Sequence, residues 1–224
     1  MKNILAFFSV CLLLCTSSWA TVLSEKTANH FSLTKLQNIY RAAESMEADF
    51  VQEVYQASLA RTKSSSGNIR VAKPNKIRWE TYKPDDSVMV SDGVKLWYFN
   101  PKSNNGKGQV IEHSARDLAS QPIYQILTGQ AELTKEFEVL KITKEHGIAK
   151  GAAISVVSLK PRHSMGDLET VQITVDANSL ILSILLENKS GNHTRISLQN
   201  QKLGSKLPPV LFNFKAPAEA EIVK

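Results

Sequence analysis

The chain has 224 residues, a length that suits one domain with a sizeable core, and its formal net charge is +6 at pH 7. Its basic residues are scattered, which argues against the basic stripe with exposed aromatic residues that a nucleic-acid groove needs. Both cysteines, Cys11 and Cys15, lie near the N-terminus, so a mature chain without that segment would need neither a disulfide nor a cysteine-bound metal.

Residues 1–20 have the organisation of a secretory signal peptide. A positively charged start precedes the apolar run 4–15, which is too short to span a bilayer comfortably. The small-x-small pattern at 18–20 predicts cleavage after Ala20, which leaves residues 21–224 as a single exported domain. Cys15 raises the alternative of a lipid-modified membrane anchor. However, Leu14 before it is larger than the small residue that normally precedes a lipid-modified cysteine.

One helix and then a strand are predicted after a polar lead-in. Ser32 can cap a helix, and apolar residues follow it at helical spacing. These residues are Leu33, Leu36, Ile39, Tyr40 and Ala43. The spacing predicts a helix that packs on a sheet. From Met46 the apolar period changes to two, and the polar, Ser-rich stretch 56–66 is predicted to form a hairpin end.

Residues 67–101 predict an antiparallel meander. Alternating apolar residues indicate half-buried strands, and the turn residues at 84–86 and 92–93 separate those strands. The apolar strand residues include Ile69, Val71, Ile77, Trp79, Met89, Trp97 and Phe99. Adjacent carboxylates at Asp85 and Asp86 could form an acid/base pair, but on a turn such residues more often cap the backbone and face water.

The second half of the chain predicts a short helical region and more strands. Residues 117–129 are expected to be helical in one or two pieces, with Ile123, Ile126 and Leu127 on the apolar face. Strands are predicted over 137–143, 152–160, 170–175, 180–186 and 194–198. Because a sheet of this length must curl to hide its edges, we expect an α+β fold in which helices cover the concave face of a strongly curved antiparallel sheet.

No pattern for catalysis or for a cofactor stands out. The five histidines lack ligand spacing, and the chain has no nucleophile elbow, phosphate-binding loop or dinucleotide fingerprint. We therefore expect neither an enzyme nor a metal or cofactor. The surplus of apolar residues fits two interpretations, an ordinary packed core or an apolar cavity between the sheet and the helices.

The central stretch also resembles the periplasmic outer-membrane lipoprotein carrier family (LolA). The shared features are Arg-Trp at 78–79, a Pro-Asp-x-Ser turn at 84–87, Val-Ser-Asp-Gly-x-x-Leu-Trp at 90–97 and an aromatic-Asn-Pro end at 99–101. Weaker matches are Phe-x-Gln at 50–52, Pro122, 168–176 and 212–214. Together these matches occur in the family's order and cover nearly all of the mature chain.

The resemblance implies an unclosed β-barrel with a helical lid, working as a monomeric periplasmic chaperone. Triacylated lipoproteins would be loaded by an ATP-driven (ABC-type) inner-membrane release complex and passed to an outer-membrane receptor. The expected cavity residues are Phe50, Ile69, Val71, Ile77, Trp79, Met89, Trp97, Phe99, Ile173, Leu182, Ile184 and Leu186. The expected lid residues are Lys73, Leu33, Leu36, Ile39, Tyr40, Ile123, Ile126 and Leu127.

Lys73 departs from the family pattern, which commonly has Arg before this proline to tie the strand to the lid. Arg offers five donors in a planar fork, whereas Lys offers three on a compact ammonium, so a weaker latch is expected. The alternative is a solvated lysine before a turn.

Two other functions are compatible with parts of the pattern. A periplasmic regulator on the same fold would sense a lipoprotein or peptide, but it would be expected to carry an additional domain. An exported hydrolase would need a nucleophile motif that this sequence does not contain.

Overall fold

The computed structural model describes residues 31–146 and 153–223. The signal peptide predicted for residues 1–20 therefore lies outside the described residues. From Phe31 onward the described chain forms one compact unit. Within these ranges no helix is long and apolar enough to cross a membrane.

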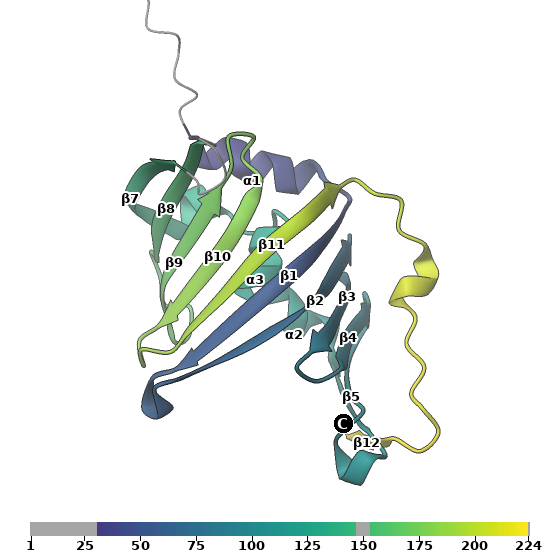
Figure 1. Ribbon diagram of the computed structural model, residues 1–224. Helices are drawn as coiled ribbons and strands as arrows, with labels where there is room; N and C mark the ends of the chain where they lie inside the picture. Colours follow the sequence, from purple (N-terminus) through teal and green to yellow (C-terminus); the bar gives the residue numbers. More distant parts are fainter. Residues whose placement is uncertain (1–30, 147–152, 224) are drawn as a thin grey trace, which may run out of the picture. The chain divides into compact units, whose positions relative to one another are not determined.

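A single curved sheet forms the body of this unit (Figure 1). The sheet has 12 strands in the order β12-β6-β5-β4-β3-β2-β1-β11-β10-β9-β8-β7. Neighbouring strands are antiparallel except for β12, which pairs with β6 in parallel. Because β12 and β7 lie at opposite ends of this order, the sheet is unclosed, and the predicted α+β fold is confirmed.

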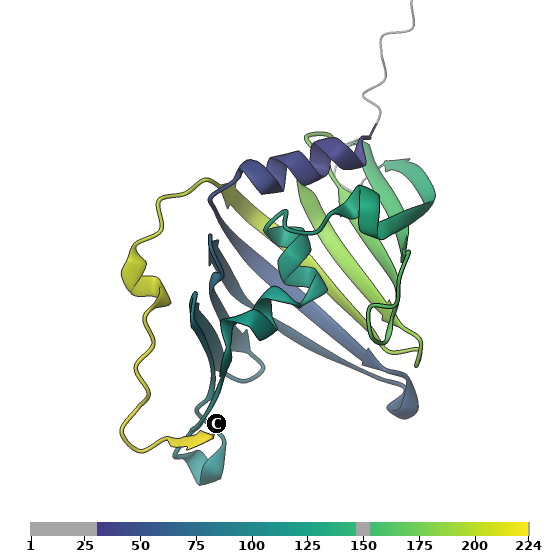
Figure 2. The same ribbon diagram turned by 180° about the vertical axis from the view of Figure 1, so that it is seen from behind.

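The strands are β1 (Ser45–Gln56), β2 (Arg61–Ala72), β3 (Lys76–Lys83), β4 (Ser87–Asp92), β5 (Lys95–Asn100), β6 (Gln109–Ser114), β7 (Phe137–His146), β8 (Ala153–Pro161), β9 (Leu168–Val175), β10 (Ile181–Asn188), β11 (His193–Leu203) and β12 (Glu221–Val223). The α-helices are α1 (Leu33–Ala42), α2 (Ala115–Ala119), α3 (Pro122–Leu127) and α4 (Leu133–Glu136). These helices lie across the concave face of the sheet (Figure 2).

Local sequence explains where the helices begin. The Ser32 hydroxyl accepts a hydrogen bond from the backbone N–H of Lys35 at 3.2 Å and so caps α1 as expected. Ser114 and Asp117 form a reciprocal capping box on α2. Pro122 occupies the first turn of α3, where its missing N–H costs nothing.

The hydrophobic core lies between the helices and the concave face. Leu36 and Tyr40 of α1 are buried in the same cluster as Ile173, Ile184 and the rest of the β8–β11 wall. Burying an aliphatic or aromatic side chain of this size contributes about 1.5–3 kcal/mol. Packing on the sheet therefore stabilises these helices, of which α2, α3 and α4 are too short to be stable alone.

Three segments differ from the sequence-based expectation. The predicted hairpin end at 56–66 is much shorter, because β2 already begins at Arg61 and its serines pair with β1. The helix α4 was not predicted, and its four residues are too few for a periodic pattern. The strand β12 near the C-terminus was not predicted either, because its three residues are all exposed and so carry no pattern of burial.

An ion-pair network crosses the convex face of β1, β2 and β3. Arg70 contacts Glu47 at 3.2 Å and Glu80 at 2.9 Å, and Arg78 contacts Glu80 at 2.6 Å. Partial burial alone would raise the pKa of the Glu80 carboxyl, but the hydrogen bonds and charges of Arg78 and Arg70 outweigh burial and lower it.

Replacing Glu80 by Gln should therefore weaken the acid sensitivity of the fold. A lowered pKa means that the stabilisation from Glu80 is fully present above its ordinary value of 4.5 and is lost as the pH falls through the folded-state value. We expect Glu80→Gln to cost about 1 kcal/mol at pH 7 and less at pH 3. Urea unfolding of both proteins at the two pH values measures this. Glu219→Gln, an exposed position, is the control, and an equal cost at both pH values would contradict the prediction.

Candidate functional site

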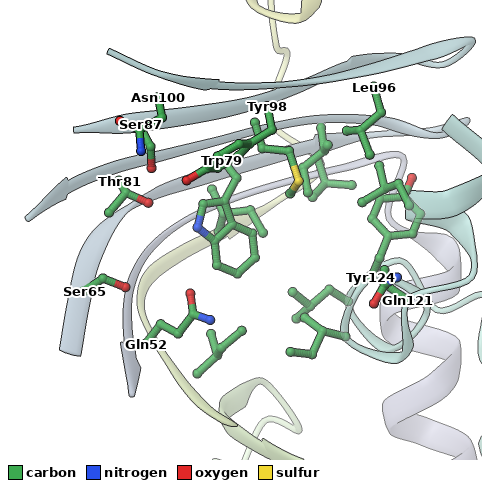
Figure 3. A pocket seen from close by; sticks show the side chains of 18 of the residues that line it. Gln52, Ser65, Trp79, Thr81, Ser87, Leu96, Tyr98, Asn100, Gln121 and Tyr124 are labelled. Carbon is green, nitrogen blue, oxygen red and sulfur yellow. The ribbon is translucent and has the colours of Figure 1, made fainter. Parts of the chain in front are cut away.

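A cavity of about 820 Å³ lies between one half of the sheet and the helices α2 and α3 (Figure 3). Its apolar lining comes from the concave side of β2 to β5, from the turn between β3 and β4, from β11 and from the two helices. These apolar residues are Ile69, Val71, Ile77, Trp79, Pro84, Met89, Leu96, Tyr98, Leu118, Ile123, Tyr124, Leu127 and Ile196. The cavity is thus a largely apolar hollow next to, and continuous with, the packed core.

Strand register explains why large apolar side chains gather here. Ile69 lies opposite Trp79, Trp79 opposite Met89, and Met89 opposite Tyr98, so one row of side chains runs across four strands. Because side chains alternate along a strand, the whole row points to the concave face. Met adds a flexible wall that can adapt to irregular ligands.

The structure brings together part of the predicted site. Five predicted wall residues line the cavity, namely Ile69, Val71, Ile77, Trp79 and Met89. Two predicted lid residues, Ile123 and Leu127, also line it. Whether these residues bind a ligand stays a prediction.

Other predicted site residues belong to the packed interior. Phe50, Ile173 and Ile184 are fully buried, and Leu186 packs against the same core; the Phe50 ring lies 4.6 Å from the Trp79 ring. Among the predicted lid residues, Leu33, Leu36, Tyr40 and Ile126 are core residues and Ile39 packs against them. These residues form the hydrophobic core next to the cavity and do not line it.

Trp97 and Phe99 require a correction, because they do not line the cavity. Their neighbours Leu96 and Tyr98 do, so the two predicted residues lie on the opposite face of β5. There the Phe214 ring contacts both, with ring centroids 5.8 Å from Trp97 and 6.2 Å from Phe99. The sequence predicts the alternation in this strand correctly, but it does not show which of the two faces lines the cavity.

Leu182 requires a second correction. The pairing of β10 with β9 shifts register between Ile181 and Ser183, so Ile181 takes the place in the buried row that simple alternation gives to Leu182. Ile181 is fully buried, and Leu182 is only half-buried. An irregularity of this kind leaves no signal in a run that is apolar on both faces.

The helix α1 is held to the far half of the sheet by buried hydrogen bonds. The Tyr40 hydroxyl donates to Gln201 Oε1 at 2.7 Å and accepts from the backbone N–H of Ile181 at 2.8 Å. The Gln201 amide in turn donates to the Ile181 carbonyl. Burial raises the pKa of Tyr40, so the hydroxyl keeps its proton and its donor role throughout the ordinary pH range.

Lys73 contacts the C-terminal end of α1, where helical carbonyls have no intrahelical partner. Its Nζ donates to the Tyr40 carbonyl at 3.1 Å and to the Arg41 carbonyl at 2.6 Å. A cation at this terminus is also favoured by the helix dipole. Partial burial lowers the pKa of the Lys73 ammonium, an effect that the nearby Glu44 carboxylate opposes.

The turn after α3 also meets the end of α1. Gly129 has a positive φ of 67°, and a Cβ there would lie 2.2 Å from the Arg41 backbone nitrogen. Arg41 Nε donates to the Gly129 carbonyl at 3.4 Å, and its Nη2 pairs with Glu132 at 3.0 Å. The end of α1 thus joins β2 and the turn between α3 and α4.

The sequence profile of the family described as outer membrane lipoprotein carrier protein LolA matches residues 41–215. The chain belongs to this family. The LolA match spans all strands that form the cavity wall and the helices α2 and α3 that cover it. The family is one of carriers rather than enzymes.

Two relatives have names that agree with the LolA assignment. An outer-membrane lipoprotein carrier protein of Dechloromonas aromatica is 27% identical over 86% of this chain and 87% of its own. One from Methylibium petroleiphilum is 26% identical over 91% of this chain and 95% of its own. Among solved structures, a LolA superfamily protein from Nitrosomonas europaea covers 81% of this chain and 96% of its own, with 16% identity and a TM-score of 0.42.

Proposed function

We propose that this protein is a periplasmic chaperone that holds the acyl chains of lipoproteins in its cavity and carries them to the outer membrane. The observation that carries the proposal is the apolar cavity of about 820 Å³ beneath α2 and α3, in a chain of the LolA family. The leader predicted at residues 1–20 supports export.

The physics of lipid transfer explains why such a cavity is needed. Each methylene buried in a bilayer contributes about 0.8 kcal/mol, so a chain of about sixteen carbons resists leaving by roughly 12 kcal/mol. The cavity must offset most of this cost while still allowing release. The sequence has no phosphate-binding loop, so in this proposal an ATP-driven inner-membrane complex supplies the energy and an outer-membrane receptor accepts the cargo from the monomeric carrier.

The test uses an environment-sensitive apolar dye and a synthetic triacylated lipopeptide. We expect the mature protein to bind the dye, and the lipopeptide to displace it. Met89→Glu, which puts a charge on the cavity wall, should weaken both events, whereas Val94→Glu on a hairpin tip that is 75% exposed should weaken neither. Absence of dye binding, or turnover of ester substrates by pure protein, would overturn the proposal.

Lys73 should act as a latch between β2 and α1 in this proposal. We expect Lys73→Arg to favour closure and slow dye entry, because a guanidinium can hold both carbonyls in a fork. Lys73→Leu should leave the lid open, whereas Lys73→Arg should strengthen the latch by about 1–2 kcal/mol, the value of one charge-assisted hydrogen bond. That corresponds to a roughly five- to thirty-fold shift in population.

Dye-entry rates and lipopeptide transfer to purified receptor would test the latch, compared across the wild-type protein and the Lys73→Arg and Lys73→Leu variants. An open carrier should take up dye quickly and release cargo poorly. If all three proteins behave alike, Lys73 only fixes the end of α1.

A further inference from the structure

The cavity wall changes from apolar to polar toward one end of the strands. Beyond the row that contains Trp79 and Met89, the same concave face carries uncharged hydrogen-bonding side chains. They are Gln52, Ser65, Thr81, Ser87 and Asn100, here called the polar belt, and all five line the cavity. Gln52 pairs with Ser65 across β1 and β2, and Thr81 pairs with Ser87 across β3 and β4.

The polar belt lies along one side of the cavity, facing Leu96 and Tyr124 on the other side (Figure 3). All five of its residues are half-buried. Strand register places Thr81 and Ser87 at one level, one step beyond the apolar row. The pair of Gln52 and Ser65 lies one step further along the strands, because Thr81 is opposite Gly67.

The side chains of this belt are largely unengaged. In the described part of the chain, those of Gln52, Ser65, Thr81 and Ser87 form no hydrogen bond. Asn100 Oδ1 accepts from the backbone N–H of Lys102 at 3.0 Å, which leaves its amide NH₂ group unused. By contrast, Ser91 on the same face of β4 is fully buried and donates to the Asn75 carbonyl at 2.8 Å. Most donors and acceptors of the belt side chains are therefore not used by other protein groups.

Carboxylates also reach the cavity, but they differ from the belt. Asp85 is paired with Lys102, and Asp117 accepts from the Ser114 backbone as part of the α2 cap. Together with Asp86 they lie on a turn and a helix rather than on the strands. Apart from the imidazole of His113 on β6, the strand wall offers only neutral groups, and a neutral donor–acceptor set matches a neutral polar ligand.

We propose that the polar belt binds the ester and amide groups that join acyl chains to the lipid-modified cysteine of the cargo. This inference rests on the proposed carrier function and goes beyond it by assigning a head-group subsite. Ester and amide carbonyls are neutral acceptors, which the hydroxyls of Thr81 and Ser87 and the amides of Gln52 and Asn100 can satisfy. Binding them in this belt sets how deeply the chains enter the apolar end of the cavity.

The experiment compares an ester-linked triacylated lipopeptide with its analogue in which ethers replace the two esters. The ether analogue keeps the chains and loses the two ester carbonyls. We expect the mature wild-type protein to bind the ester form roughly tenfold more tightly in dye displacement, the effect of one to two hydrogen bonds. The double variant Thr81→Val/Ser87→Ala, which removes the two hydroxyls that lie at one level, should lose most of this preference for the ester form.

A matched control removes two exposed hydroxyls on the same sheet, outside the cavity. Thr62→Val/Ser64→Ala should keep the full preference for the ester form. Equal affinities of wild type for the ester and ether forms, or a preference retained in full by Thr81→Val/Ser87→Ala, would overturn the head-group subsite and leave the carrier function standing. If neither lipopeptide displaces bound dye, the carrier proposal itself fails.

Discussion

Replacing Gly129 by Ala should destabilise the protein by about 3 kcal/mol, because two penalties act at one position. The positive φ of 67° disfavours any side chain, and the new Cβ would lie 2.2 Å from the Arg41 nitrogen and 2.6 Å from its Cα. Backbone atoms cannot rotate away as a flexible side chain can. The turn after α3 would therefore have to separate from the end of α1.

Denaturant unfolding measures this effect, and the chain offers a matched control. Gly166 has a similar φ of 60°, but a Cβ added there would meet no heavy atom within 4 Å, so Gly166→Ala should cost only about 1 kcal/mol. Dye binding should weaken in Gly129→Ala and not in Gly166→Ala, because α3 lines the cavity. Equal losses of stability would show that backbone strain, and not the contact with α1, governs both sites.

Replacing Tyr40 by Phe should cost about 2–4 kcal/mol, the second large effect that we expect. The change leaves the Ile181 N–H without its acceptor and removes the donor to Gln201, while the aromatic ring stays in the core. A buried backbone donor without a partner carries most of the cost. The free energy of unfolding, together with hydrogen exchange at Ile181, reports both consequences.

Tyr124→Phe is the control, since Tyr124 is also a buried tyrosine. Burial raises the pKa of Tyr124 to about 12, and its buried hydroxyl lies near the Asn75 backbone without a hydrogen bond of normal geometry. Removing that hydroxyl should change stability by less than about 1 kcal/mol in either direction. A cost for Tyr124→Phe as large as that for Tyr40→Phe would contradict the role assigned to the Tyr40 hydrogen bonds.

The sequence predicts strands well where one face is buried, because alternation records burial directly. It predicts the cavity less well, as β5 illustrates. Leu96 to Phe99 alternate between two faces, and both faces are apolar because Phe214, more than a hundred positions along the chain, covers the outer one. Local sequence shows that two faces exist but not which one is concave.

The position of the polar belt at the cavity could not be predicted from local sequence, for a related reason. Serine, threonine and glutamine on a strand are normally assigned to the solvent face, and Ser65 lies in a stretch whose polar composition indicates a hairpin end. Only pairing across strands places Ser65 opposite Gln52 and Ser87 opposite Thr81. The burial of Ile181 in place of Leu182 likewise depends on how β10 pairs with β9, and the alternation within one strand does not show that pairing.

At β5, a single layer of sheet separates the cavity from the C-terminal segment on the outer face. Figure 1 shows the C-terminal segment leaving β11 and running along the outside toward β12. Its Phe214 touches Trp97 and Phe99, while Leu96 and Tyr98 of the same strand face the cavity. Arg78, next to the cavity residues Ile77 and Trp79, likewise donates to the Leu211 carbonyl. Through these contacts, a movement of β3 or β5 would also shift the C-terminal segment on the outer face.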